Sequence, residues 1–155
     1  KKFKNCKIFL SIDGIGKVSE YARPGVSWKI IYDTFKQWKK TDFEIIVTPT
    51  ITLSTLEHVS SLMNFINVNK VRCSRFNVAY DGHISILNLN IDTRKEIINN
   101  NDDHLLDKVI NLSEMSNKNI NKILEYIESY DSINEYKFKD VSPKVYNKLL
   151  EMSNE

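Results

Sequence analysis

The stretch that decides the fold reads KIFLSIDG and runs from Lys7 to Gly14. Its apolar residues follow one another almost without a break, and Asp13-Gly14 ends the run. A short, nearly continuous apolar run that stops at a turn signal is typical of a strand buried on both faces. We therefore expect the chain to begin its fold with a buried strand over residues 7–13.

Strand and helix patterns alternate downstream of this stretch. The expected order is a helix over 27–38 with Ser27 as its N-cap, a strand over 43–48, a helix behind the capping-box pattern of 54–57, a strand over 71–80 and a strand-like piece over 83–89. Helices that connect strands at this spacing favour parallel pairing through right-handed crossovers. The pattern thus predicts an α/β fold, either an open doubly wound sheet or part of a barrel.

The amino-acid composition changes after Asp92, where the chain becomes charged and rich in asparagine. Helices are expected over 102–112, over 118–129 and from Ser142-Pro143 onward, and the run 99–103 is expected to be a loop. The second of these helices carries apolar residues at i, i+3, i+4 and i+7, from Ile120 to Ile127, which is one face of an amphipathic helix. We divide the chain into an α/β part, residues 1–92, and a helical C-terminal extension, residues 93–155.

Composition excludes several classes of protein. The 155 residues carry a formal charge of +2 and two cysteines, Cys6 and Cys73. Two cysteines 67 positions apart, with no C-x-x-C spacing, argue against a disulfide framework and against a self-contained zinc or iron–sulfur site, since zinc typically takes four Cys or His ligands. A dedicated nucleic-acid surface would show clustered basic charge. No apolar run reaches the roughly 18 residues of a membrane span, and the first residues do not have the pattern of a signal peptide. We expect a cytoplasmic protein, and because residue 1 is Lys, a chain that begins inside a longer one.

Polar residues gather where the first strand ends. Ser11 and Asp13 lie on one face of that strand, because side chains alternate along it. In parallel α/β folds ligands bind at the carboxyl ends of the strands, so a hydroxyl and a carboxylate at this place are candidates for ligand contact. Gly14 would let the backbone approach a ligand closely. On pattern alone, a plain chain-reversing turn is the preferred explanation of Asp13-Gly14.

Two further candidates follow along the chain. Arg23 lies in the loop before the helix over 27–38, where its guanidinium could hold a carboxylate through two hydrogen bonds. A solvated loop arginine is the other interpretation. Thr48 and Thr50 take the corresponding place after the second strand, although threonine is also common in strands.

These residues resemble a known family. The segments SIDGIG (11–16) and EYARPG (20–25), with Trp28 behind them, are similar to the fourth strand and following loop of radical S-adenosylmethionine (SAM) enzymes. The likeness is to a branch with a shortened, twitch-type C-terminal region that is met in phage. It continues through FEIIVTPTITLSTLEHVSSLMNFI (43–66) as the fifth strand and helix, and reaches ESYDSINEYKFKDVSPKVYNKLLE (128–151) in the tail.

The resemblance implies a partial (β/α)₆ barrel with a TIM-like arrangement. Enzymes of this family bind a [4Fe–4S] cluster and SAM in the barrel mouth and cleave SAM reductively. The resulting 5′-deoxyadenosyl radical abstracts a hydrogen atom from a peptide or small-molecule substrate. By this likeness Ser11 contacts the ribose or methionyl part of SAM, Asp13 and Gly14 shape the rim, Arg23 holds the methionyl carboxylate and Thr48 adds a further SAM contact.

The cysteine motif of the family, C-x-x-x-C-x-x-C, is absent from this sequence. Three thiolates hold such a cluster, so the chain alone is not expected to cleave SAM. We therefore expect a C-terminal portion of a radical SAM enzyme whose partner is the missing N-terminal half, or another copy of the chain, at an exposed sheet edge. The alternative is a non-enzymatic half-barrel remnant that self-associates or binds a partner. A nucleotide-binding domain is disfavoured because neither a P-loop nor G-x-G-x-x-G occurs.

Overall fold

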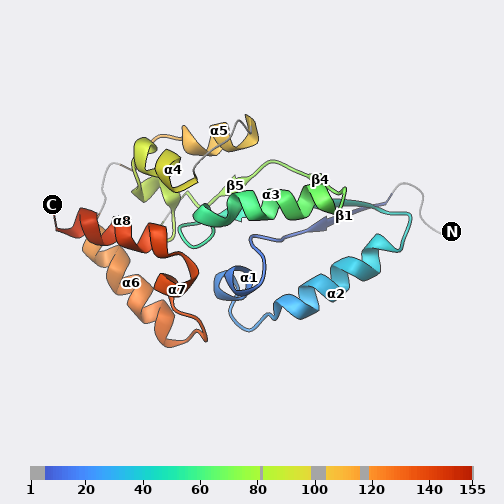
Figure 1. Ribbon diagram of the computed structural model, residues 1–155, viewed down its shortest axis with the longest axis horizontal. Coiled ribbons are helices and arrows are strands. Elements are labelled where there is room, and N and C mark those ends of the chain that lie inside the picture. The colour runs from blue at the N-terminus through green and yellow to red at the C-terminus, as the bar shows by residue number, and fades with distance from the viewer. Residues whose placement is uncertain (1–5, 81, 99–103, 116–118, 155) are drawn as a thin grey trace.

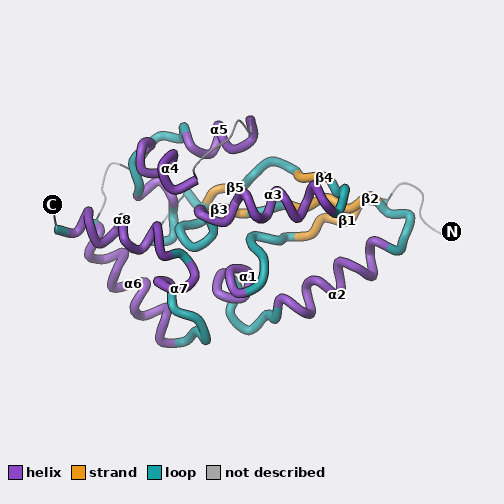
Figure 2. Tube along the Cα trace, viewed as in Figure 1, coloured by secondary structure: helices purple, strands orange, loops and turns teal. Residues whose placement is uncertain are grey.

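The computed structural model describes residues 6–80, 82–98, 104–115 and 119–154 as a mixed α/β fold. Short parallel strands lie in the middle of the molecule and helices surround them (Figures 1 and 2). The strands are β1 (Lys7–Leu10), β2 (Glu44–Val47), β3 (Thr50–Ile51), β4 (Arg72–Cys73) and β5 (Asn77–Val78). The expected α/β class is confirmed.

The strands form parallel ladders in chain order. One sheet has the order β1-β2-β4, and β3 pairs with β5 beyond it. Pro49 lies between β2 and β3 and separates the two ladders, because it has no backbone N–H to donate. Thr48 N still donates to Leu10 O at 2.9 Å and Ser74 N to Val47 O at 2.8 Å, so the strands continue past their regular ends. The carboxyl ends of the strands consequently meet at one edge.

Helices α2 (Trp28–Lys39) and α3 (Val59–Val68) follow β1 and β3 and pack against each other. The Phe65 ring contacts the rings of Trp28 and Phe35 at centroid distances of 5.8 and 5.1 Å. Both helices share a hydrophobic core with Ile45 and Val47 of β2. The predicted N-cap of α2 is confirmed, because Ser27 Oγ accepts a hydrogen bond from Lys29 N at 3.2 Å.

The C-terminal extension is helical and docks beside the carboxyl ends of the strands (Figure 1). Its described part contains most of α4 (Ile91–Ile98), followed by α5 (His104–Ile110), α6 (Ile120–Ser132), α7 (Phe138–Val141) and α8 (Pro143–Ser153). The buried core runs from Ile12 to Leu149, so the extension packs on the α/β part. Pro143 lies in the first turn of α8, as predicted. None of the described helices is long and apolar enough to cross a membrane.

The strand predicted over 83–89 is wrong. The segment forms a short 3-10 helix, η2 (Ile86–Asn88), for which Ser85 Oγ accepts from Leu87 N at 3.2 Å. Asn88 Nδ2 donates to Gly82 O at 3.1 Å and Ser85 O at 2.9 Å, which closes a turn rather than extending the chain. The strand expected over 71–80 is two short strands, and the loop expected over 99–103 lies outside the described residues.

The capping box predicted at 54–57 is also wrong. A 3-10 turn, η1 (Leu56–His58), leads into α3, and its N-cap Thr55 makes no capping hydrogen bond. Glu57 Oε2 instead accepts from Lys144 N at 2.9 Å and Val145 N at 3.2 Å. The carboxylate therefore caps α8, a helix that lies far away in the sequence. The pattern identified a capping residue and assigned it to the wrong helix.

Candidate functional site

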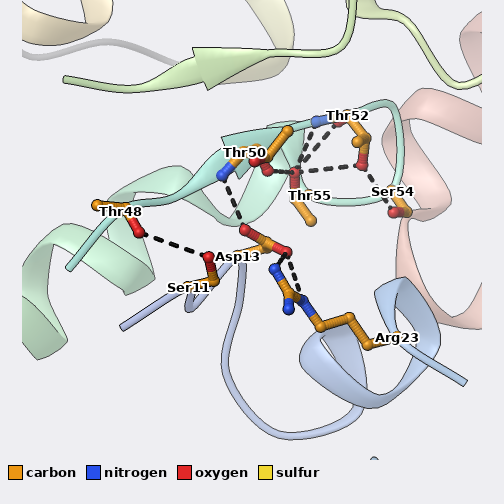
Figure 3. Close-up of polar contacts among 8 residues, drawn as sticks. All are labelled: Ser11, Asp13, Arg23, Thr48, Thr50, Thr52, Ser54 and Thr55. Carbon is orange, nitrogen blue, oxygen red and sulfur yellow. Dashed lines mark hydrogen bonds and ion pairs between the residues drawn. The ribbon is translucent and has the colours of Figure 1, made fainter. Parts of the chain in front are cut away.

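Asp13 joins three segments at the carboxyl end of β1. Its Oδ1 accepts from Thr50 N at 2.8 Å, and its Oδ2 accepts from Arg23 Nε and Nη2, each at 2.8 Å (Figure 3). The residue is only 9% exposed. A buried carboxylate with charged and backbone donors around it is firmly placed. Asp13 thus fixes the position of Arg23 beside the first residue of β3.

Arg23 offers a second guanidinium edge. It lies just after α1 (Lys17–Ala22), and its side chain is 40% exposed. Because Nε and one N–H of Nη2 are directed at Asp13, the edge formed by Nη1 and the other N–H of Nη2 points elsewhere. This edge can form two parallel hydrogen bonds with a carboxylate.

Ser11 and Thr48 face each other on the neighbouring strand ends. Their hydroxyl oxygens lie 3.5 Å apart (Figure 3), and the contact is exposed. The predicted Ser11, Asp13, Arg23 and Thr48 are therefore gathered at one edge of the sheet. Only Asp13 and Arg23 of these line the cavity described below.

Gly14 has a packing role. A Cβ at this position would lie 2.5 Å from Cγ1 of Val18, which is closer than real Cβ contacts come. The missing side chain therefore lets α1 pack against the end of β1. The structure gives an internal reason for glycine here, and that reason does not involve a ligand.

Hydroxyl groups continue along the loop after β3. Thr55 Oγ1 accepts from Thr52 N at 2.9 Å, and Thr52 Oγ1 lies 3.0 Å from Ser54 Oγ (Figure 3). Ser142 Oγ donates to Ser54 O at 2.6 Å and ties the same loop to the C-terminal extension. The loop is held from both sides, so its hydroxyl groups have fixed positions.

A cavity of about 360 Å³ opens at this edge of the sheet. One side of it is polar and the other is aromatic. It is lined by Asp13, Tyr21, Ala22, Arg23, Thr50, Thr52, Leu53, Ser54, His83, Ile84, Tyr126, Ile127, Tyr130 and Phe138. Pockets that take small organic ligands have volumes from about 300 Å³ upward, with mostly apolar walls and a few placed polar groups. The cavity has these properties.

The aromatic wall consists of tyrosines in contact with one another. Tyr126 and Tyr130 stack with centroids 5.9 Å apart, and Tyr21 meets Tyr130 edge to face at 5.3 Å. The His83 ring lies 5.4 Å from that of Tyr126. These rings come from α1, α6 and the segment before η2. The wall is therefore assembled from parts of the chain that are distant in sequence.

Tyr21 anchors this wall. Its hydroxyl donates to Asp131 Oδ1 at 2.8 Å, and the Tyr130 hydroxyl donates to Tyr21 O at 3.2 Å. Burial, together with the nearby Asp131 carboxylate, raises the pKa of Tyr21 well above its usual range. Burial also raises the pKa of Tyr130. Both hydroxyls are therefore neutral donors at physiological pH.

The cysteines do not fit an iron–sulfur site. Cys6 and Cys73 are not joined in a disulfide, and both are of intermediate exposure. The part of the chain that the structure describes contains no group of three or more His, Cys, Asp or Glu side chains that could hold a metal ion. A [4Fe–4S] cluster requires thiolate ligands that these residues do not supply.

Comparison with protein families, with curated proteins and with solved structures found no match to this chain.

Most residues of the aromatic wall were not predicted from the sequence. Tyr126 and Tyr130 are four residues apart on α6 and lie beside its apolar stripe. Two tyrosines at this spacing share a helix face, and this spacing could have indicated from the sequence that they form one surface. His83 is exposed and also lines the cavity.

Proposed function

We propose that this chain is the C-terminal portion of a radical SAM enzyme and that its cavity binds SAM. The observation that carries the proposal is Arg23, which Asp13 holds at the carboxyl ends of parallel strands with one guanidinium edge directed away from the ion pair. SAM combines a carboxylate, a ribose and a planar adenine. The cavity combines an arginine, hydroxyl groups and an aromatic wall.

Each part of the cavity suits one part of this ligand. Arg23 pairs with the methionyl carboxylate through two N–H groups. Thr50 and Thr52 offer hydroxyls to the ribose, and the rings of Tyr126 and Tyr130 offer faces and edges to the adenine. Ser11 and Thr48 extend the polar rim outside the cavity and are contacts for a ligand that reaches past Asp13.

The strand arrangement supports a partial barrel. Parallel strands in the order β1-β2-β4, with α2 and α3 in contact, are the product of successive right-handed strand–helix units. Ligands of such folds bind at the carboxyl ends of the strands, where the cavity lies. In the complete protein, thiolates from outside these residues would hold the cluster, and the reduced cluster would supply the electron for SAM cleavage. This chain contributes the binding, orientation and shielding of SAM.

Titration calorimetry of the chain with SAM tests the proposal. We expect binding, and a loss of about 10-fold or more in affinity for Arg23→Ala, since a charge-assisted hydrogen bond contributes on the order of 1.5–3 kcal/mol. Arg75→Ala is the matched control, because Arg75 is an exposed arginine outside the cavity lining and its loss should leave the affinity unchanged. Equal heats from the wild type and Arg23→Ala would contradict the role of Arg23.

The second candidate is a non-enzymatic half-barrel module that binds a partner or another copy. The exposed Phe9 on the outer strand favours it, because an aromatic residue on a strand edge marks a contact surface. Absence of SAM binding in a folded chain would favour this candidate.

A further inference from the structure

The outer edge of β1 presents unpaired backbone groups. In the described part of the chain, β2 is the one strand that pairs with β1. Glu44 N donates to Cys6 O at 3.3 Å and Thr48 N to Leu10 O at 2.9 Å. The even-numbered residues of β1 therefore direct their backbone groups toward β2. By the alternation of a parallel ladder, Lys7, Phe9 and Ser11 direct theirs outward.

The side chains at these outward positions are exposed. Lys7, Phe9 and Ser11 are all classed as exposed, and the Phe9 side chain is 62% exposed. An edge strand with free N–H and C=O groups and an exposed aromatic residue is a template for another strand. Here the outer strand has no proline or bulge that would prevent pairing.

We propose that a second copy of this chain pairs with β1 in antiparallel orientation, with Phe9 on the two-fold axis. The Phe9 N–H of each copy then donates to the Phe9 C=O of the other. Lys7 of each copy exchanges N–H to C=O hydrogen bonds with Ser11 of the other. This joins the two sheets β1-β2-β4 into one continuous sheet with β1 strands at its centre.

The sequence of β1 is complementary to itself in this register. Phe9 meets Phe9, which covers the exposed rings, and Ile8 meets Leu10 on the face that packs against the helices. Lys7 lies opposite Ser11, so the lysines are kept apart. An axis on Lys7 would place like charges opposite each other, and an axis on Ile8 would form fewer hydrogen bonds over residues 7–11. A symmetric interface requires this self-complementarity, which argues for a second copy rather than an unrelated strand.

The dimer leaves the cavity open. None of residues 7–11 lines the cavity, and the Ser11 hydroxyl already faces Thr48 on the β2 side. The dimer therefore does not depend on a bound ligand. We propose the dimer for the 155-residue chain by itself, because in a longer enzyme the preceding barrel strand would take the same edge of β1. SAM binding in the cavity is tested separately, so either proposal can fail without the other.

Sedimentation equilibrium of the 155-residue chain over a range of concentrations tests the proposal. We expect the mass to rise from the 18.1 kDa of one chain toward twice that value. Phe9→Pro removes the N–H on the axis, which makes no bond to β2, and should weaken the dimer at least 10-fold. Phe9→Lys places like charges on the axis and should have the same effect. Val68→Lys, at a position that is 70% exposed on α3, is the charge-matched control and should dimerise like the wild type.

A cross-link reports the register directly. In a chain with Cys6→Ser and Cys73→Ser, Phe9→Cys places two thiols opposite each other in a hydrogen-bonded pair, whose Cα separation of about 5.5 Å fits a disulfide. We expect mild oxidation to yield a covalent dimer, whereas Val68→Cys in the same background should not. Circular dichroism confirms that each variant is folded. A monomer at every concentration, a dimer insensitive to both Phe9 substitutions, or no cross-link at Phe9→Cys would each overturn the proposal, and the first would assign the edge to a different strand.

Discussion

Removing the charge of Asp13 should loosen the candidate site without unfolding the protein. Asp13→Asn keeps an oxygen for Thr50 N but loses the carboxylate that Arg23 contacts through two nitrogen atoms at 2.8 Å. The amide also brings N–H groups toward the N–H groups of Arg23 if its oxygen stays on Thr50. The ion pair and its geometry are therefore lost together.

The exposures of the two side chains set the size of the effect. Exposed ion pairs contribute about 0–1 kcal/mol, and breaking a fully buried pair costs about 3–5 kcal/mol. The Asp13 side chain is 10% exposed and that of Arg23 is 40% exposed, so solvent screens the arginine but hardly the carboxylate. We expect a coupling free energy of about 1–2 kcal/mol between the two residues, after this discount.

A double-mutant cycle measures that coupling. Urea unfolding of the wild type, Asp13→Asn, Arg23→Ala and the double variant can be followed by the fluorescence of the two tryptophans on α2. The exposed pair Lys29–Asp33 on the same helix, with N and O atoms 2.8 Å apart, is the control and should show a smaller coupling. Additive effects of Asp13→Asn and Arg23→Ala would refute the assignment of Asp13 as the residue that holds Arg23.

Three other substitutions test the contacts that hold the helices in place. Arg94→Met removes a fully buried guanidinium that donates to four backbone carbonyls, including Ile110 O at 2.7 Å. In urea unfolding it should lower the free energy of unfolding by about 3 kcal/mol or more. The control Arg75→Met, at an exposed position, should change that free energy by less than about 0.5 kcal/mol. Glu57→Gln weakens the cap of α8 and should cost about 1 kcal/mol in the same assay; an unchanged midpoint would argue against capping. Because the pKa of Tyr21 is raised in the folded state, the stability that the neutral Tyr21 hydroxyl contributes is complete below pH 10 and declines as the pH rises above that value. Tyr21→Phe should therefore lose stability less steeply at alkaline pH, measured by circular dichroism. An equally steep loss would contradict the raised pKa.

Local patterns predicted the elements whose determinants lie within a few residues. The apolar run that ends at Asp13 produced β1, but the expectation of a strand buried on both faces was wrong, because Lys7 and Phe9 are exposed. Ser27 and Pro143 marked the starts of α2 and α8. In these cases the signal and the structure occupy the same turn or strand. The segment 83–89 failed because its apolar residues fit a buried strand as well as a buried turn, and the Asn88 hydrogen bonds that favour the turn cannot be read from periodicity.

Contacts between residues that are distant in the sequence could not be predicted from local sequence patterns. Arg94 is fully buried, and it donates to carbonyl groups 5 to 18 residues away in the chain. Nothing in its local sequence distinguishes it from a surface arginine of α4. Likewise Asp13 and Arg23 were predicted as separate ligand contacts, and the structure shows that they bind each other first. Whether Ser11, Gly14 and Thr48 contact a ligand stays a prediction.

The C-terminal extension supplies part of the cavity lining, including Tyr126, Tyr130 and Phe138, so ligand binding and the docking of this extension are linked. The polar side comes from the strand ends, and the aromatic side comes largely from α6. Tyr21 reaches Asp131 on α6, and Ser54 of the cavity loop binds Ser142 just before α8. Undocking the extension would therefore remove Tyr126 and Tyr130 from the aromatic wall while leaving Asp13 and Arg23 in place. Since a ligand that binds only the assembled cavity stabilises that state, any true ligand of this site must also hold α6 against the strand ends.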